Sequence, residues 1–188
     1  MKGRVTVLDS SNELFAAALK YLGYSANDTD PKHLKEAADV IKKAKPYWAA
    51  FNASSYIKEL TTGNIWLAHG YSNDFFQADL DAQEAKRPFR IVKGMPKEGA
   101  VLALDSMVIH KAAPRPDLAL KFMNFMLDGK NSAELTNLIG SGNPNAAAID
   151  TIDSARVKGP IVRCPGSEEL CGAASAARVP VCMSVAAQ

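Results

Sequence analysis

The stretch Gly63-Asn-Ile-Trp-Leu-Ala-His-Gly-Tyr-Ser-Asn-Asp74 decides how we interpret the fold of this chain. It starts at a helix-ending glycine, continues through apolar residues 65–68, and ends with Tyr71 and Asp74 just after Gly70. Short apolar runs of this kind are typical of buried strands in a parallel sheet. Ligands of open α/β proteins bind at the carboxyl ends of such strands. An aromatic ring and a carboxylate at that edge would suit an organic cation.

Strand-like and helix-like segments alternate on both sides of this stretch. Residues 4–8 predict a short strand, and Ser10 with Glu13 fits the capping box that starts a helix. Such alternation favours an α/β sandwich with a largely parallel sheet. Further strands are expected at 48–51, 87–92 and 101–109, and further helices from residues 31, 56, 75, 114 and 131.

Composition and charge exclude several protein classes. The 188 residues are 47% hydrophobic and 22% charged, as in an ordinary globular protein. A net charge of +2 with interspersed signs argues against a nucleic-acid binder. No apolar run is long enough to span a membrane. Residues 1–9 lack an apolar segment of signal-peptide length, so we expect nothing in them to direct export.

The last residues differ in composition from the rest. All fourteen aromatic residues lie at or before Phe125, whereas all three cysteines follow residue 160. Residues 158–188 are rich in Ala, Val, Cys and Pro, which is typical either of a divergent or wrongly framed end or of a flexible tail. We expect residues 160–188 not to pack as ordered structure.

The sequence carries no recognisable enzyme motif. It has no phosphate-binding P-loop and no G-x-S-x-G nucleophile turn. The cysteines Cys164, Cys171 and Cys182 are separated by six and ten residues, which is not a zinc pattern. We therefore expect a protein that is not an enzyme and that holds no metal and no cofactor.

Three carboxylates remain as candidates for binding a cation. Asp105 interrupts an apolar run, so it is either a strand-end residue that caps the next loop or a ligand for a cation in a buried strand. Asp74 is either the N-cap of a helix from Phe75 or part of the cation site. Glu13 is either the capping-box partner of Ser10 or a further ligand.

Aromatic and imidazole side chains near Gly70 have plain structural interpretations as well. A tyrosine in the position of Tyr71 is more often part of the core or its rim than a surface that binds a ligand. His69 lies inside an apolar segment and is expected to be a core histidine with its hydrogen bonds satisfied. Trp66 is expected in the core.

Short segments along the chain match, in order, the pattern of one receptor family. The segments are 7–15 (VLDSSNELF), 21–24 (YLGY), 56–65 (YIKELTTGNI), 70–74 (GYSND), 96–99 (PKEG), 104–107 (LDSM), 119–127 (ALKFMNFML) and 143–147 (NPNAA). In them the chain resembles the periplasmic polyamine-binding proteins, which are the spermidine/putrescine receptors of ABC importers. The resemblance covers residues 4–152 and is closest to putrescine-type members.

The resemblance implies which residues touch the ligand. Carried over by position, Glu13, Tyr71, Asp74 and Asp105 are expected to contact it. Tyr71 stands where the family usually has Trp, which keeps an aromatic face of different width. Ser141 stands where the family often has Tyr, so one wall of the site is altered. Carboxylates would neutralise the two ammonium groups of a diamine, and aromatic faces would cover its methylenes.

The resemblance also implies the fold and its division. It implies a type II periplasmic-binding-protein fold, in which two α/β lobes close over the ligand. Residues 1–102 would form the second lobe nearly complete, residues 103–150 would return to a truncated first lobe, and residues 151–188 would be a divergent, poorly ordered tail. The resemblance further implies that the family's opening segment has no counterpart in these residues. A first lobe of residues 103–150 alone would expose a wide apolar face, which predicts poor solubility.

The function implied is that of the solute-binding component of a polyamine ABC transport system in the periplasm. Its partners would be a polyamine, either putrescine or spermidine, and the membrane permease of the importer. Two alternatives stay open: a receptor for another cationic solute, and a truncated or frameshifted product that binds nothing. An anion receptor is disfavoured because Asp74 and Asp105 stand where it would need Arg or backbone amides.

Overall fold

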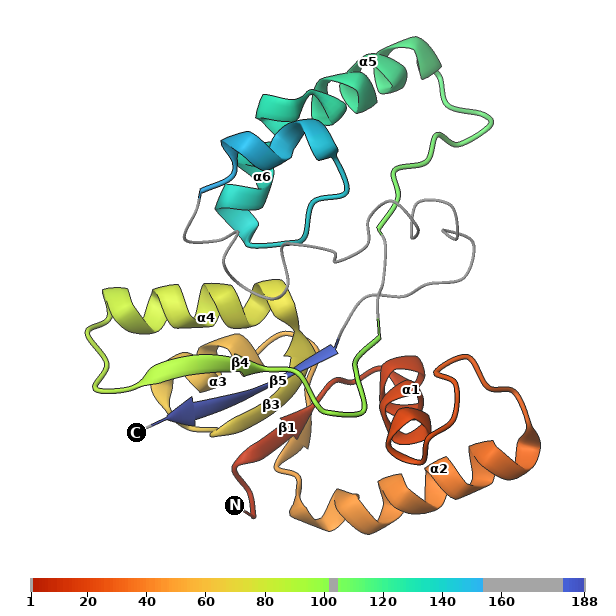
Figure 1. Cartoon of the computed structure of the whole chain (residues 1–188), viewed down its shortest axis with the longest axis vertical. Helices are drawn as coiled ribbons and strands as arrows, with labels where there is room; N and C mark the ends of the chain where they lie inside the picture. Colours follow the sequence, from red (N-terminus) through yellow and green to blue (C-terminus); the bar gives the residue numbers. More distant parts are fainter. Residues whose placement is uncertain (1, 102–104, 154–180, 188) are drawn as a thin grey trace. The chain divides into compact units, whose positions relative to one another are not determined.

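The computed structural model of the protein describes residues 2–101, 105–153 and 181–187, the last by their backbone (Figure 1). Its contacts divide the chain into two units, one of residues 1–103 and 177–188 and the other of residues 104–176. The first unit holds a sheet of five strands in the order β2-β1-β3-β5-β4. The strands are β1 (Val5–Val7), β2 (Ala50–Phe51), β3 (Leu67–Tyr71), β4 (Arg90–Gly94) and β5 (Val181–Ala187).

The helices lie largely where the sequence predicts them. Those of the first unit are α1 (Ser11–Tyr21), α2 (Pro31–Ala44), the 3-10 turn η1 (Lys45–Tyr47), α3 (Tyr56–Thr62) and α4 (Ser72–Glu84). Those of the second unit are α5 (Pro116–Leu127), α6 (Gly129–Ile139) and the 3-10 helix η2 (Ala146–Thr151).

Helices α1 and α2 form a pair after β1. The hydroxyl of Ser10 accepts the amide of Glu13 at 3.5 Å, which confirms the predicted N-cap. Asp30 caps α2 by accepting the amide of Lys32 at 2.8 Å. The two helices pack through small and apolar side chains, with Leu19 and Ala37 fully enclosed.

The chain from α3 to α4 contains the stretch that decides the fold, and the predicted strand is shifted within it. β3 starts at Leu67, two residues later than expected, and Trp66 is 39% exposed. The prediction of a core tryptophan is therefore wrong, because the Trp66 ring lies before the strand, with the Arg4 guanidinium 5.4 Å from its centre. Gly63 ends α3 in the left-handed conformation at φ 76°, as its position predicts.

The sheet is mixed rather than largely parallel. β1 runs parallel to both β2 and β3, whereas β5 runs antiparallel to β3 and to β4. The prediction that residues 160–188 do not pack is wrong for residues 181–187, because their backbone fills the place between β3 and β4 (Figure 1). The edges of β3 and β4 thereby gain a hydrogen-bonding partner. Residues 160–180 and Gln188 lie outside the described residues.

The strand predicted at residues 101–109 is absent from residues 105–109. This segment has no regular structure, and Asp105 is exposed rather than buried in a strand. A strand needs a neighbour for its backbone hydrogen bonds, and the described residues of the second unit include no strand.

The second unit exposes many apolar side chains. α5 has no buried residue, and Phe122 and Phe125 are 59% and 58% exposed. A small core of Ala133, Ala148 and Ile152 joins α6 to η2. The prediction that this part exposes an apolar face is confirmed. Among the described residues, no helix combines the length and the apolar character needed to cross a membrane.

Candidate functional site at the carboxyl end of β3

The candidate site begins where β3 ends and α4 begins. Tyr71 is the last residue of β3 and the N-cap position of α4, and 40% of its surface is exposed. Asp74 lies in the first turn of α4, half-buried. The interpretation of Asp74 as an N-cap for a helix from Phe75 is wrong, because the helix already starts at Ser72. Its carboxylate still lies at a helix N-terminus, where negative charge is favoured.

Tyr56, at the start of α3, organises this junction. Its side chain is fully buried, and its hydroxyl donates a hydrogen bond to the Asp74 carboxylate. The same hydroxyl accepts the backbone amide of Tyr71 at 3.1 Å. The other oxygen of Asp74 accepts the side-chain amide of Asn73 at 2.9 Å. In the sequence, Tyr56 is predicted to start a helix and belongs to one of the family segments, but nothing there predicts a role for it in the site.

Gly70 makes room for the Tyr56 ring. A Cβ atom on residue 70 would lie 2.6 Å from Cε2 of Tyr56 and 2.8 Å from its hydroxyl oxygen, closer than real Cβ contacts. The glycine before Tyr71 therefore has a packing function that its place in the sequence did not reveal.

The surroundings keep the Tyr56 phenol neutral. Burial raises the pKa of Tyr56 above its ordinary value, and the hydrogen bond to Asp74 raises this pKa further. A neutral phenol can donate to a carboxylate, which an ionised phenolate could not do.

Glu13 lies at the same edge of the sheet as Asp74. β1 and β3 are parallel neighbours, and each is followed by a helix whose first turn carries one of these carboxylates. Because parallel strands end at the same edge, the first turns of α1 and α4 lie on that edge together. Glu13 is half-buried, and its backbone amide donates to Ser10. The structure thus brings three of the predicted site residues, Glu13, Tyr71 and Asp74, to one edge of the first unit.

Asp105 and Ser141 belong to the second unit. Asp105 is exposed outside any helix or strand. Ser141 is half-buried directly after Gly140, which ends α6 in the left-handed conformation at φ 70°. Their contribution to a common site with Glu13, Tyr71 and Asp74 stays a prediction.

His69, two residues before Tyr71, is a buried histidine with one bonded nitrogen. It is 7% exposed, and its Nδ1 accepts the backbone amide of Leu8 at 3.4 Å. Its Nε2 has no hydrogen-bond partner among the described residues. The prediction of a core histidine is confirmed, but that of satisfied hydrogen bonds holds for one nitrogen only. Burial lowers the pKa of His69 to about 4, so the ring is neutral at pH 7.

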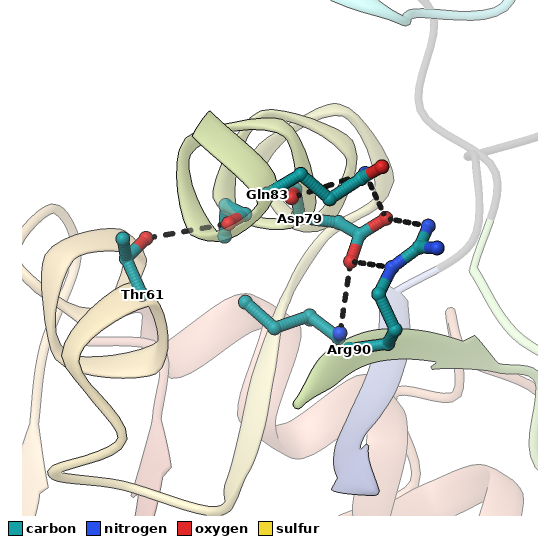
Figure 2. A network of polar contacts seen from close by, with 6 residues as sticks. Thr61, Asp79, Gln83 and Arg90 are labelled. Carbon is teal, nitrogen blue, oxygen red and sulfur yellow. Dashed lines mark hydrogen bonds and ion pairs between the residues drawn. The ribbon is translucent and has the colours of Figure 1, made fainter. Parts of the chain in front are cut away.

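Asp79 fastens α4, which carries Asp74, to β4 (Figure 2). Its oxygens accept two hydrogen bonds from the Arg90 guanidinium, at 3.0 and 2.6 Å, and one from the backbone amide of Ile91 at 2.9 Å. Gln83 donates a further bond at 2.9 Å. Burial raises the pKa of Asp79, but these hydrogen bonds outweigh burial and lower it overall. We assign this network a structural role. No group of three or more His, Cys, Asp or Glu side chains suited to a metal ion occurs within the described part of the chain.

Comparison with known proteins identifies the family. Residues 1–159 match the family of bacterial extracellular solute-binding proteins. The chain belongs to this family.

Similar proteins carry polyamine-binding names. A putrescine/cadaverine-binding protein of Pseudomonas aeruginosa is 65% identical over 152 residues, which are 81% of this chain and 43% of that protein. The putrescine-binding periplasmic protein SpuD of the same species is 41% identical over 151 residues, or 80% of this chain and 41% of that protein. The resemblance to the polyamine-binding receptors is thus confirmed. The chain spans less than half the length of these relatives.

A solved structure supports the fold. The spermidine/putrescine ABC transporter substrate-binding protein PotD of Streptococcus pneumoniae superimposes with a TM-score of 0.67 at 25% identity. The match covers 84% of this chain and 47% of that structure. The predicted fold class, the α/β fold of periplasmic binding proteins, is confirmed by this likeness.

Proposed function

We propose that this chain belongs to the solute-binding component of a polyamine ABC transport system and that its ligand is a diamine such as putrescine. The observation that carries the proposal is the Asp74 carboxylate, which the Tyr56 hydroxyl holds in the first turn of α4, three residues after the exposed Tyr71 ends β3. The 65% identity to a putrescine/cadaverine-binding protein supports the same ligand class. The periplasm would be its location, and the permease of the importer its second partner.

The chemistry of the site suits an alkyl-ammonium group. Asp74 uses one oxygen for Tyr56 and the other for Asn73, and a carboxylate can accept about four hydrogen bonds in all. Acceptor positions therefore remain for an ammonium ion. The Tyr71 ring offers a face for the adjoining methylenes. We assign Glu13 to the same end of the ligand, and Asp105 and Ser141 to the part of the site contributed by the second unit.

Calorimetric titration of the 188-residue chain with putrescine tests the proposal. We expect saturable binding, about tenfold or more weaker in Asp74→Asn, because a hydrogen bond to a charged group contributes about 1.5–3 kcal/mol. Asp81→Asn on the same helix is the matched control and should bind as the wild type does. 1,4-Butanediol, which has the same length without charge, should not bind.

Other outcomes would favour the alternatives. A chain that binds neither putrescine nor spermidine, although its α/β unit is folded by circular dichroism, would overturn the proposal and support a non-binding product. Binding of a different cation in an Asp74-dependent way would indicate a receptor for another cationic solute. Unchanged putrescine affinity in Asp105→Asn would remove that residue alone from the site.

A further inference from the structure

We infer that Tyr56 is a positioning residue of the cation site, whose buried hydroxyl fixes both the Asp74 carboxylate and the Tyr71 backbone. The inference rests on the proposed function for its ligand, but its geometry stands without one. The three residues come from α3, the end of β3 and the first turn of α4. One hydroxyl therefore joins the three elements that meet at the candidate site.

The hydroxyl has the right hydrogen-bonding capacity for both partners. A phenol offers one donor and at least one acceptor position. Here the donor goes to Asp74 and the acceptor takes the amide of Tyr71 at 3.1 Å. That amide is at the first position before α4, where backbone N–H groups lack helical partners. Tyr56 thus supplies the acceptor that the N3 Glu or Gln of a capping box gives to the N-cap amide, while orienting the carboxylate.

Packing restricts the Tyr56 ring to this position. The ring is fully buried, lies edge-on to Phe75 with centroids 6.1 Å apart, and closely covers Gly70. A ring so enclosed holds its hydroxyl at a fixed point, so the carboxylate of Asp74 is oriented before any ligand arrives. Pre-orientation of this kind lowers the entropy that binding must overcome.

A purely structural role would need only the ring. Phenylalanine would fill the same volume over Gly70 and keep the contact with Phe75. The hydroxyl is therefore the part of Tyr56 that distinguishes positioning from packing, and Tyr56→Phe isolates it.

The first test uses the protein without ligand. In Tyr56→Phe we expect the Tyr71 amide to exchange with solvent at least about tenfold faster by NMR, because it loses its acceptor. The carboxyl-carbon signal of Asp74 should move as well. Tyr47→Phe, which alters an exposed tyrosine of η1, should change neither signal. If both signals stay unchanged in Tyr56→Phe, the inference is wrong.

The second test measures putrescine affinity in a double-mutant cycle. We expect Tyr56→Phe to weaken binding about fivefold or more in the wild-type background and less than about twofold in the Asp74→Asn background. Such non-additivity indicates that Tyr56 acts through Asp74, whereas equal losses in both backgrounds would indicate a general structural effect and overturn the inference. Thermal unfolding of each variant shows that the chain is folded.

The two proposals fail in different ways. Asp74→Asn that binds putrescine as well as the wild type would overturn the proposed site, while the ligand-free signals would still decide whether Tyr56 holds Asp74 and Tyr71. An Asp74-dependent affinity that Tyr56→Phe does not alter would overturn the positioning role and leave the proposed function in place.

Discussion

At the scale of single residues, the buried His69 links the stability of the chain to pH. Its Nδ1 accepts the amide of Leu8 at 3.4 Å, and burial lowers its pKa to about 4 from an ordinary value of 6.5. The unfolded chain therefore binds a proton at His69 between these two pH values and the folded chain does not. The contribution of the neutral His69 to the free energy of unfolding is complete above pH 6.5 and decreases as the pH falls toward 4.

We predict that replacing His69 removes this dependence. Wild-type protein should lose about 3 kcal/mol of unfolding free energy between pH 6.5 and 4 through this group, at about 1.4 kcal/mol per pH unit. His69→Gln should show a flatter profile over that range in urea unfolding followed by circular dichroism. His110→Gln, which alters an exposed histidine, is the control and should keep the wild-type slope. Parallel profiles for His69→Gln and wild type would contradict the prediction.

The Tyr56 phenol provides a second prediction at this scale. Burial raises its pKa, and the neighbouring Asp74 carboxylate adds to that effect. In Asp74→Asn the pKa of Tyr56 should move back toward its ordinary value of 10.0, because the negative charge beside the hydroxyl is gone. In an alkaline NMR titration of tyrosine ring carbons, Tyr56 should begin to ionise at a lower pH in Asp74→Asn than in the wild type. An unaltered Tyr56 titration would mean that the two side chains do not interact.

At the scale of elements, one carboxylate joins α4 to β4 through several hydrogen bonds. Asp79 is 18% exposed and accepts bonds from Arg90, Gln83 and the Ile91 backbone. Its pKa is lowered, so its contribution to stability is present above the ordinary pKa of 3.8 and is lost as the pH falls below that value.

We predict that Asp79→Asn costs about 1–2 kcal/mol at pH 7, because the Ile91 amide and the guanidinium lose a charged acceptor. The variant should also show a weaker loss of stability below about pH 4. Asp117→Asn is a matched control, since Arg115 binds Asp117 in the same two-bond geometry at 3.0 and 2.7 Å but on the surface. Exposed pairs contribute about 0–1 kcal/mol. Equal losses in the two variants would contradict the assigned role of Asp79.

Elements with local signals could be predicted from the sequence. The predicted limits of α3 match the structure, because Gly63 ends the helix where a left-handed conformation is needed. The cap of α1 was likewise visible in Ser10 and Glu13. The start of α4 at Ser72 could not be predicted, because its N-cap residue, Tyr71, makes no side-chain capping bond. The Tyr71 amide is instead bonded to Tyr56, which is distant in sequence.

Elements that depend on distant partners could not be predicted in this way. Residues 101–109 have the apolar composition of a strand, but residues 105–109 form none. The sequence of β5 carries no clear strand signal. This strand forms by pairing with β3 and β4. Strand formation depends on neighbouring strands, whereas helix signals are local. The errors of the sequence-based prediction therefore concern mainly the strands.

At the scale of the whole molecule, the candidate site could be predicted only in part. Glu13, Tyr71 and Asp74 were identified through their order along the chain, and they do share one edge of the first unit. Tyr56 and Gly70 were missed because their role is a contact between α3 and β3 that no spacing encodes.

At the scale of the whole molecule, α5 of the second unit also exposes an apolar face. Leu118, Phe122 and Phe125 follow one another at helical spacing on α5 and are all exposed, by 48%, 59% and 58%. Contiguous apolar surface of this kind promotes association. We predict that the chain self-associates with rising concentration and that Phe122→Ser combined with Phe125→Ser shifts it toward the monomer in sedimentation velocity. Tyr47→Ser, which removes a single exposed aromatic from the first unit, should leave association unchanged. Equal association of all three proteins would show that α5 is not the surface responsible, because the two serines remove apolar area only there.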